Sequence, residues 1–264
     1  MITLNSDAAS TSLSKTTKAI LNEYGIKLNK NLGQNYLIDR NKRDQIIQFG
    51  NLTKDDVVLE IGPGIGTLTI ELAKRVKKVI AIEQDSNICQ ILENRLKKEN
   101  IDNVELINDD ALNVEFPKFD KIISNLPYQI SSPITFKFLN YDFQLAILMY
   151  QKEFASRMNG KVGSKDYSRL SAMLYFKCDV DLLTGVSAES FIPKPKVDST
   201  VVRLTPKLPE LNGQLKHLNI NEINEKDFKT YSKFVKALFQ HRNKKVKNAL
   251  IDSRHIITDL DKKE

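Results

Sequence analysis

The tetrapeptide Asn125-Leu126-Pro127-Tyr128 says more about chemistry than any other stretch of this sequence. The exocyclic amino nitrogen of adenine is a poor nucleophile, because its lone pair is delocalised into the ring. The amide oxygen of Asn125 and the backbone carbonyl of Leu126 could accept both of its N–H bonds and aim the lone pair at an electrophile. Pro127 would stiffen the turn, and Tyr128 would offer a ring on which the base stacks. Read alone, the tetrapeptide fits an ordinary Asn-x-Pro turn with a core tyrosine equally well.

A glycine loop stands upstream of the tetrapeptide. Residues 60–67 read Glu-Ile-Gly-Pro-Gly-Ile-Gly-Thr and follow an apolar, β-branched run. Glycines let the backbone turn sharply and approach a ligand, and a helix that begins there adds N–H donors. We therefore expect Gly62 and Gly64 to contact a cofactor rather than to form a mere turn. The dinucleotide fingerprint would need a glycine where Thr67 stands, so the spacing favours S-adenosylmethionine over a nicotinamide cofactor.

Two acidic residues end the next two apolar runs. Glu83 could accept hydrogen bonds from ribose hydroxyls, which both cofactors carry, so Glu83 does not discriminate between them. Asp110 is well placed for the amino group of an adenine. It fits a helix N-cap equally well.

Short apolar runs alternate with helix-like segments from about residue 55 to residue 185. The strand-like runs are residues 57–61, 79–82, 104–107, 122–124, 143–149, 180–186 and 199–204. Between two of them, residues 86–98 carry isoleucine and leucine at helical spacing. This alternation predicts a parallel sheet covered on both faces, a doubly wound α/β fold, in which ligands bind beyond the carboxyl ends of the strands. The tetrapeptide, the glycine loop and both acids should therefore converge on one edge.

A base that is modified at this edge must be accessible. A paired adenine would have to be flipped out of the helix, or the target must lie in a loop. The pocket would then need a second aromatic side chain, and Phe191 in the stretch Phe-Ile-Pro-Lys-Pro could supply it. The alternative is that Phe191 anchors a proline-stiffened connection.

Four motifs in this order resemble the small-subunit rRNA adenine dimethyltransferases of the KsgA type. They are residues 33–37 (Gly-Gln-Asn-Tyr-Leu), 60–67, 125–128 and 191–200, and the resemblance covers about residues 28–250. It implies a Rossmann-like, S-adenosylmethionine-dependent methyltransferase domain followed by a small all-helical domain. It also implies dimethylation at N6 of two adjacent adenosines near the 3′ end of small-subunit rRNA, during ribosome assembly. Tyr36 departs from the family, which commonly has Phe there, but both rings stack.

The resemblance also assigns roles by motif position. The cofactor would meet Asn35, Leu37, Gly62, Glu83, Asp110 and Asn125. Asn125 would double as a catalytic residue together with Leu126 and Tyr128 in the turn made by Pro127.

Other functions stay open. The related antibiotic-resistance methylases of large-subunit rRNA share much of the catalytic domain, although residues 163–170 and 239–245 look like the small-subunit branch. A DNA adenine methylase has the same chemistry, and a ribosome-assembly factor could act mainly by binding. A nicotinamide oxidoreductase is disfavoured by Thr67 and by the lack of an acid or base for hydride transfer.

We expect three parts in the chain: a basic N-terminal arm over residues 1–28, a catalytic domain over 29–206 and a helical RNA-binding domain over 207–264. The arm has at most one short helix, near residues 14–24. The last part holds a basic run that is nearly free of acids, which indicates phosphate contacts more than a merely solvated face. Its members are Lys233, Lys236, Arg242, Lys244, Lys245 and Lys247. We expect Lys244 and Lys245 to bind the RNA. A second basic set flanks the first motif and could guide the RNA into the pocket: Lys27, Lys30, Arg40, Lys42 and Arg43.

Composition bounds the remaining questions. The 264 residues carry a formal net charge of +7, which suits a polyanionic partner. No apolar run reaches the ~20 residues of a membrane span, and no signal-peptide core is present. Cys89 and Cys178 are expected to be buried free thiols in a reducing compartment, and the histidines show no metal-binding spacing. We therefore expect a cytoplasmic monomer, with no metal and no membrane partner, that acts on the pre-small ribosomal subunit.

Overall fold

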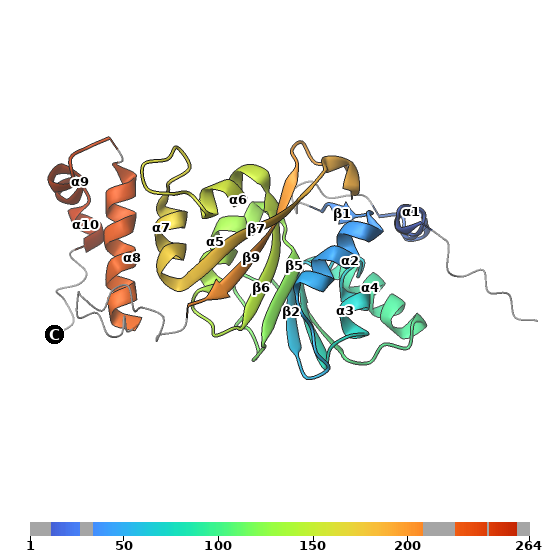
Figure 1. The fold of residues 1–264 in the computed structure, drawn as a ribbon. Coiled ribbons are helices and arrows are strands. Elements are labelled where there is room, and N and C mark those ends of the chain that lie inside the picture. Colours follow the sequence, from blue (N-terminus) through green and yellow to red (C-terminus); the bar gives the residue numbers. More distant parts are fainter. Residues whose placement is uncertain (1–11, 27–33, 208–224, 242, 258–264) are drawn as a thin grey trace, which may run out of the picture. The chain divides into compact units, whose positions relative to one another are not determined.

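The computed structural model describes residues 12–26, 34–207, 225–241 and 243–257 (Figure 1). Some residues of the motifs and basic runs above lie outside the described residues: Lys27, Lys30, Gly33 and Arg242.

The chain forms two compact units. The first comprises Met1–Ala155 and Leu182–Leu204, and the second comprises Ser156–Asp181 and Thr205–Glu264. This grouping of the folded chain does not test the expected division into arm, catalytic domain and RNA-binding domain, which stays a prediction.

A seven-stranded sheet runs through the fold in the order β4-β3-β2-β5-β6-β9-β7. Its strands are β2 (Val57–Ile61), β3 (Lys78–Glu83), β4 (Val104–Asn108), β5 (Lys121–Asn125), β6 (Leu145–Gln151), β7 (Cys178–Val186) and β9 (Ser199–Pro206). The pairs from β4 to β6 are parallel, whereas β9 runs antiparallel to β6. Every expected strand is present, and the α/β fold is confirmed. The antiparallel β9 differs from the expected all-parallel sheet, because strand direction depends on the path of the connection and not on strand composition.

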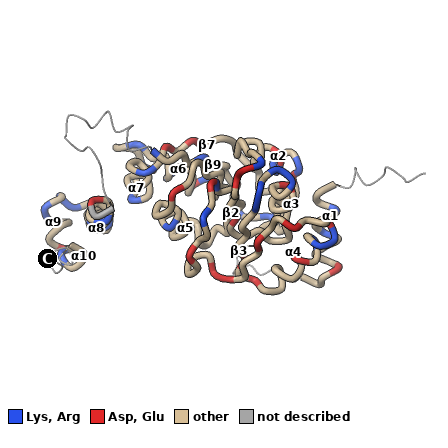
Figure 2. The backbone as a smooth tube through the Cα atoms, turned by 90° about the horizontal axis from the view of Figure 1, so that it is seen from below, with Lys and Arg blue, Asp and Glu red and all other residues tan. Residues whose placement is uncertain are grey.

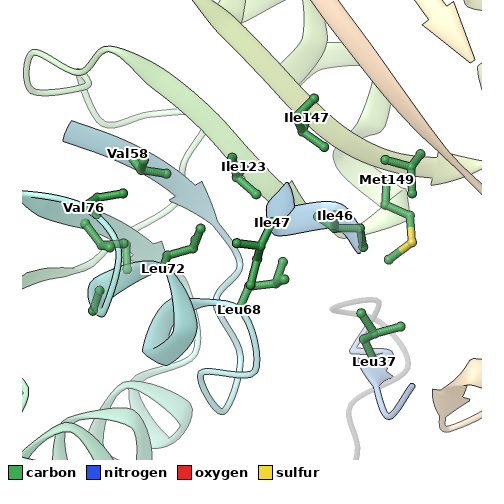
Figure 3. Packing of buried hydrophobic residues seen from close by; sticks show 14 of the residues in the cluster. Leu37, Ile46, Ile47, Val58, Leu68, Leu72, Val76, Ile123, Ile147 and Met149 are labelled. Carbon is green, nitrogen blue, oxygen red and sulfur yellow. The ribbon is translucent and has the colours of Figure 1, made fainter. Parts of the chain in front are cut away.

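Both faces of the sheet are covered. Val58 and Leu59 are neighbours on β2 and both are 0% exposed, although successive strand residues point to opposite faces. On one face, Ile47 of α2 (Arg40–Phe49) and Leu72 of α3 (Thr69–Ala73) pack against Val58 and Ile123 (Figure 3). The burial of consecutive apolar residues is what makes these strands read as continuous hydrophobic runs.

Two further helices lie where the sequence predicts them. Helix α4 (Ser86–Lys98) begins after Asp85, whose side chain accepts hydrogen bonds from the backbone N–H groups of Asn87 and Ile88. Helix α1 (Leu13–Glu23) begins after the N-cap Ser12 and packs Ile20 in a small apolar cluster. The described residues of the first unit also form α5 (Ser131–Phe138) and the start of α6 (Lys152–Met158).

A second, two-stranded sheet joins distant parts of the first unit. Strand β1 (Tyr36–Leu37) pairs antiparallel with β8 (Phe191–Ile192), which follows the short turn η4 (Ala188–Ser190). The N–H of Ile38 extends the pairing by donating to the carbonyl of Ser190 at 2.8 Å. This pairing fixes the segment that contains Asn35.

The second unit is largely helical. Its described residues form α7 (Arg169–Lys177), α8 (Glu225–Gln240), α9 (Val246–Asp252) and α10 (Arg254–Ile257). Tyr231 of α8 donates to the carbonyl of Ala172 on α7 at 3.0 Å, and its ring centroid lies 4.3 Å from that of Phe176. Ser253 donates to the carbonyl of Ala237 at 3.1 Å. The all-helical character expected after residue 207 is confirmed for the described part of that region.

The structure also bears on the cysteines and on the question of membrane spans. Cys89 and Cys178 are free and buried, as predicted. Among the described helices, none is both long enough and apolar enough to cross a membrane.

Candidate active site

A pocket opens where four neighbouring strands end. Because β4, β3, β2 and β5 are parallel, their carboxyl ends lie at the same edge of the sheet. The pocket brings together ten residues singled out from the sequence: Asn35, Leu37, Gly62, Gly64, Glu83, Asp110, Asn125, Leu126, Pro127 and Tyr128. The predicted convergence of the motifs on one edge is therefore present; the role of each residue there stays a prediction.

The glycine loop needs glycine for its conformation and for space. Gly62 has a φ of +67° and Gly64 a φ of +55°, values that strain any residue with a side chain. A Cβ on Gly62 would lie 3.0 Å from Cγ of Pro127, and one on Gly64 would lie 2.9 Å from Cε1 of Tyr36. The loop backbone thus lies directly against the tetrapeptide turn and against β1.

Glu83, at the end of β3, ties the glycine loop to the start of α4. Its Oε2 accepts a hydrogen bond from the N–H of Gly64 at 3.2 Å, and its Oε1 accepts one from the N–H of Asp85 at 3.0 Å. Burial raises the pKa of the Glu83 carboxyl, and the two backbone donors oppose that effect. Each oxygen keeps a second lone pair for a hydroxyl donor in the pocket.

Glu60 also lines the pocket, although no ligand was expected for it from the sequence. It is 1% exposed in β2, and its Oε2 has no hydrogen-bond partner among the described residues. The pKa of the carboxyl is raised to about 8. Burial is the largest cause, the charge of Glu83 adds to it, and the hydrogen bond with the Thr69 hydroxyl opposes it. The signal that could have found it is an acid inside an apolar strand, where burying a charge is costly without a partner. A cationic group in the pocket would supply that partner.

Asp110 caps a turn at the pocket wall, and its contact with an adenine amino group stays a prediction. It lines the pocket. Its Oδ1 accepts a hydrogen bond from the N–H of Leu112 at 2.9 Å, and its Oδ2 accepts one from Nδ2 of Asn113 at 3.2 Å. The side chain therefore caps the following turn, and this capping holds it at the pocket wall.

Asn125 is oriented by a residue that lies far from it in sequence. Its Nδ2 donates to the backbone carbonyl of Asn35 at 3.0 Å. Because the amide nitrogen points to this carbonyl, Oδ1 is the end of the side chain that remains to accept a hydrogen bond. The pairing of β1 with β8 holds Asn35, so the small sheet sets the direction of the Asn125 amide.

Tyr128 begins the 3-10 turn η3 (Tyr128–Ile130), directly after Pro127. Its hydroxyl oxygen lies 2.6 Å from Oγ of Ser199, the first residue of β9. Burial raises the pKa of the Tyr128 phenol, and the hydrogen bond with Ser199 lowers it. The ring is therefore tied at its far end to the sheet.

Three predicted substrate contacts do not line this pocket. Phe191 is 2% exposed and belongs to the same apolar cluster as Leu37, which is the placement expected of an anchor for the proline-stiffened connection. Lys244 and Lys245 belong to the second unit. Nζ of Lys244 lies 2.6 Å from a carboxylate oxygen of Asp252, and Lys245 is exposed at the N-cap of α9.

The family model of ribosomal RNA adenine dimethylases matches residues 25–258. The chain belongs to this family. A dimethylase-family relative from Methanosphaera stadtmanae, called a probable ribosomal RNA small subunit methyltransferase A, is 51% identical over 247 residues, which cover 94% of this chain and 85% of the relative.

Solved structures show the same fold. A dimethyladenosine transferase from Plasmodium falciparum superposes with a TM-score of 0.71 at 34% identity, covering 85% of this chain and 77% of that one. The 23S rRNA methyltransferase ErmE superposes with a TM-score of 0.64 at 29% identity, covering 86% and 88% respectively. The chain thus has the fold of an S-adenosylmethionine-dependent methyltransferase, as the sequence predicts.

The pocket residues fit the cofactor that an adenine dimethylase implies. The unpartnered carboxylate oxygen of Glu60 suits the ammonium group of S-adenosylmethionine, and the lone pairs of Glu83 suit ribose hydroxyls. At Gly62 a side chain would meet Pro127 and close the loop against the turn. Gly62, Gly64 and Asn125 line the same pocket, so a ligand held by the glycine loop would lie beside Asn125.

Proposed function

We propose that this chain transfers methyl groups from S-adenosylmethionine to N6 of two adjacent adenosines near the 3′ end of small-subunit rRNA, giving N6,N6-dimethyladenosine. The observation that carries the proposal is the hydrogen bond from Nδ2 of Asn125 to the carbonyl of Asn35 at 3.0 Å. It occupies the amide nitrogen and leaves the amide oxygen as the acceptor, at the end of a strand beside a glycine loop and two acidic residues. Such an acceptor can activate a substrate group that is both an N–H donor and a nucleophile, as the amino group of adenine is.

The relatives support small-subunit rRNA as the substrate. The relative from Methanosphaera stadtmanae is named for the small subunit, whereas ErmE, named for 23S rRNA, is less similar in sequence. We take the pre-small ribosomal subunit as the natural partner and a cytoplasmic monomer as the working form.

The reaction depends on positioning. S-adenosylmethionine supplies an electrophilic methyl group on a sulfonium. Oδ1 of Asn125 and the carbonyl of Leu126 accept the two amino hydrogens of adenine, so the nitrogen lone pair is directed out of the ring plane. Pro127 fixes the turn with a φ of −60°, and Tyr128 stacks on the base. No strong base is needed, because the proton can pass to water once the nitrogen is alkylated.

The same residues account for repeated transfer to one nitrogen. After one transfer the amino group keeps a single N–H, and either Asn125 or Leu126 can accept it. A mechanism that relies on these two acceptors, and not on proton transfer to a fixed base, therefore works on the amino group and on its monomethyl form. The target base has to reach this pocket unstacked, as in a loop or after flipping.

The test uses unmethylated small subunits and S-adenosylmethionine with a labelled methyl group, followed by digestion and mass analysis of the nucleosides. The proposal predicts labelled dimethyladenosine in small-subunit RNA with the wild type, and none with Asn125→Ala. Asn140→Ala, which changes an exposed asparagine, is the matched control and should match the wild type. Label confined to large-subunit RNA or DNA would contradict the proposed substrate. If Asn125→Ala still supports subunit assembly, binding is a separable function.

A further inference from the structure

One contact links the tetrapeptide to the start of strand β9. The hydroxyl of Tyr128 and Oγ of Ser199 lie 2.6 Å apart, a short hydrogen bond between residues 71 positions apart in the sequence. Tyr128 is half-buried at the pocket, while Ser199 is 1% exposed. The contact therefore connects a pocket side chain to the buried interior.

Ser199 is held rigidly. It begins β9 and pairs with Gln151 at the end of β6, in a register that continues through five more residue pairs to Ala146 and Leu204. The residue before it, Asp198, accepts two hydrogen bonds. Its carbonyl accepts from the N–H of Lys152 at 3.0 Å, and its Oδ1 accepts from the N–H of Ala188 at 2.9 Å. The Ser199 hydroxyl is thus a fixed point of the sheet.

The ring of Tyr128 has no comparable support from its own segment. Its backbone belongs to a three-residue turn, and no residue of that turn is fully buried. An aromatic side chain on such a turn can change both of its torsions, and each change tilts the ring. A hydrogen bond at the para position fixes the end of the ring that moves farthest, so it sets the plane on which a base would stack.

We propose that Ser199 is a positioning residue for the target base: its hydroxyl holds the Tyr128 ring in the plane that places the adenine amino group against Asn125. This inference rests on the proposed function, because it needs adenine as the stacked group. Ser199 touches neither substrate nor cofactor and acts only through Tyr128. The purely structural alternative is that the two hydroxyls merely satisfy each other in the interior.

The two alternatives predict different kinetics. If Ser199 positions the ring, Ser199→Ala lowers kcat on the RNA substrate by roughly threefold to tenfold, the range for losing one neutral hydrogen bond that aligns reacting groups. Tyr128→Phe lowers kcat by a similar factor, and the double variant shows no further loss. The dissociation constant for S-adenosylmethionine stays within about twofold of the wild type in all three. Thr200→Ala removes a hydroxyl from the next residue of β9, which faces the opposite side, and serves as the matched control.

The experiment measures kcat and KM for the wild type, the three variants and the control, with cofactor affinity measured by calorimetry on the same preparations. The substrate is the unmethylated small subunit, or whichever of 23S rRNA and adenine-containing DNA the wild type methylates instead. Unchanged kcat in Ser199→Ala, or losses that multiply in the double variant, would overturn the role of Ser199. Methylation of another substrate would overturn the proposed function alone, while methylation of none would overturn both.

Discussion

At the scale of single residues, the proposed reaction depends most on Asn125. Its amide does two things at once: the nitrogen donates to Asn35 at 3.0 Å, and the oxygen is left for the substrate. The sequence predicted the second role but gave no sign of the first. The partner is a backbone carbonyl 90 residues away, and only the folded β1–β8 pairing brings it there.

This dual role makes a nearly isosteric change informative. Asn125→Asp keeps an acceptor oxygen but replaces the donor to Asn35 by a second oxygen, which repels the carbonyl and turns the side chain away. We expect kcat to fall by about a hundredfold, the effect of misplacing a reacting group by about 1 Å. Single-turnover methylation measures it. Activity within a few-fold of the wild type would show that the contact with Asn35 does not set the orientation.

Glu60 predicts how stability depends on pH. Burial raises the folded-state pKa of its carboxyl from 4.5 to about 8, so the folded protein holds a proton that the unfolded chain releases between these values. The contribution is therefore favourable below the unfolded pKa and is lost as pH rises towards 8, by at most about 1.4 kcal/mol for each pH unit. Glu60→Gln cannot titrate and should flatten this slope.

The measurement is urea unfolding of the cofactor-free protein at pH 5, 6.5 and 8, for the wild type and Glu60→Gln. The variant should gain stability relative to the wild type as pH increases. A constant difference across the three pH values would mean that Glu60 is charged in the folded protein over the whole range.

At the scale of elements, much of the first unit could be predicted. Continuous β-branched runs identified the strands, and helix α4 has the bounds that its apolar spacing indicates. The direction of β9 could not be predicted, because composition does not encode strand direction. Strands β1 and β8 have two residues each, too few for any periodic pattern. Sequence alone therefore fits Phe191 to the pocket and to the core equally well.

The pocket wall that carries Asp110 depends on another element. Nζ of Lys137, on α5, donates to the carbonyls of Ala111 at 2.9 Å and Leu112 at 3.2 Å and also to that of Val114. The same ammonium lies 4.3 Å from the ring centroid of Phe116. One side chain thus fixes the loop that follows Asp110.

Lys137→Met should loosen this loop, because three carbonyls lose their charged donor while the apolar part of the side chain is kept. We expect unfolding free energy to fall by about 1.5–3 kcal/mol, as for hydrogen bonds to a charged group. Cofactor affinity should fall several-fold through Asp110. Lys98→Met, at an exposed position on α4, is the control. Equal stability of the two variants in urea unfolding would contradict this role of Lys137.

At the scale of the whole molecule, the net charge of +7 suits a polyanionic partner. The traces of α9 and α10 carry lysine and arginine (Figure 2). The sequence singled out Lys244 and Lys245 in this region. The structure adds that Lys244 is paired with Asp252 while both side chains remain largely exposed. Such an exposed pair is weak and can yield to a phosphate.

The double variant Lys244→Ala/Lys245→Ala should bind RNA more weakly than the wild type. The plot of log affinity against log salt should become less steep, by about one unit of slope for each phosphate that the variant no longer neutralises. Cofactor affinity should not change, because neither residue lines the pocket. Lys97→Ala/Lys98→Ala removes the same charge from exposed positions of α4 and is the control. An unchanged salt slope in the Lys244/Lys245 variant would remove this region from the RNA-binding surface.

Dimethylation of adjacent adenosines in small-subunit rRNA is tested most directly by primer extension on treated subunits. Two methyl groups at N6 block base pairing, so reverse transcription of RNA from small subunits incubated with the wild type and cofactor should stop at two neighbouring adenosines near the 3′ end. Subunits incubated with Asn125→Ala should give no such stop. Two results would contradict the proposed activity. One is full-length extension on small-subunit RNA although the enzyme binds the cofactor, and the other is extension stops that occur only in large-subunit RNA.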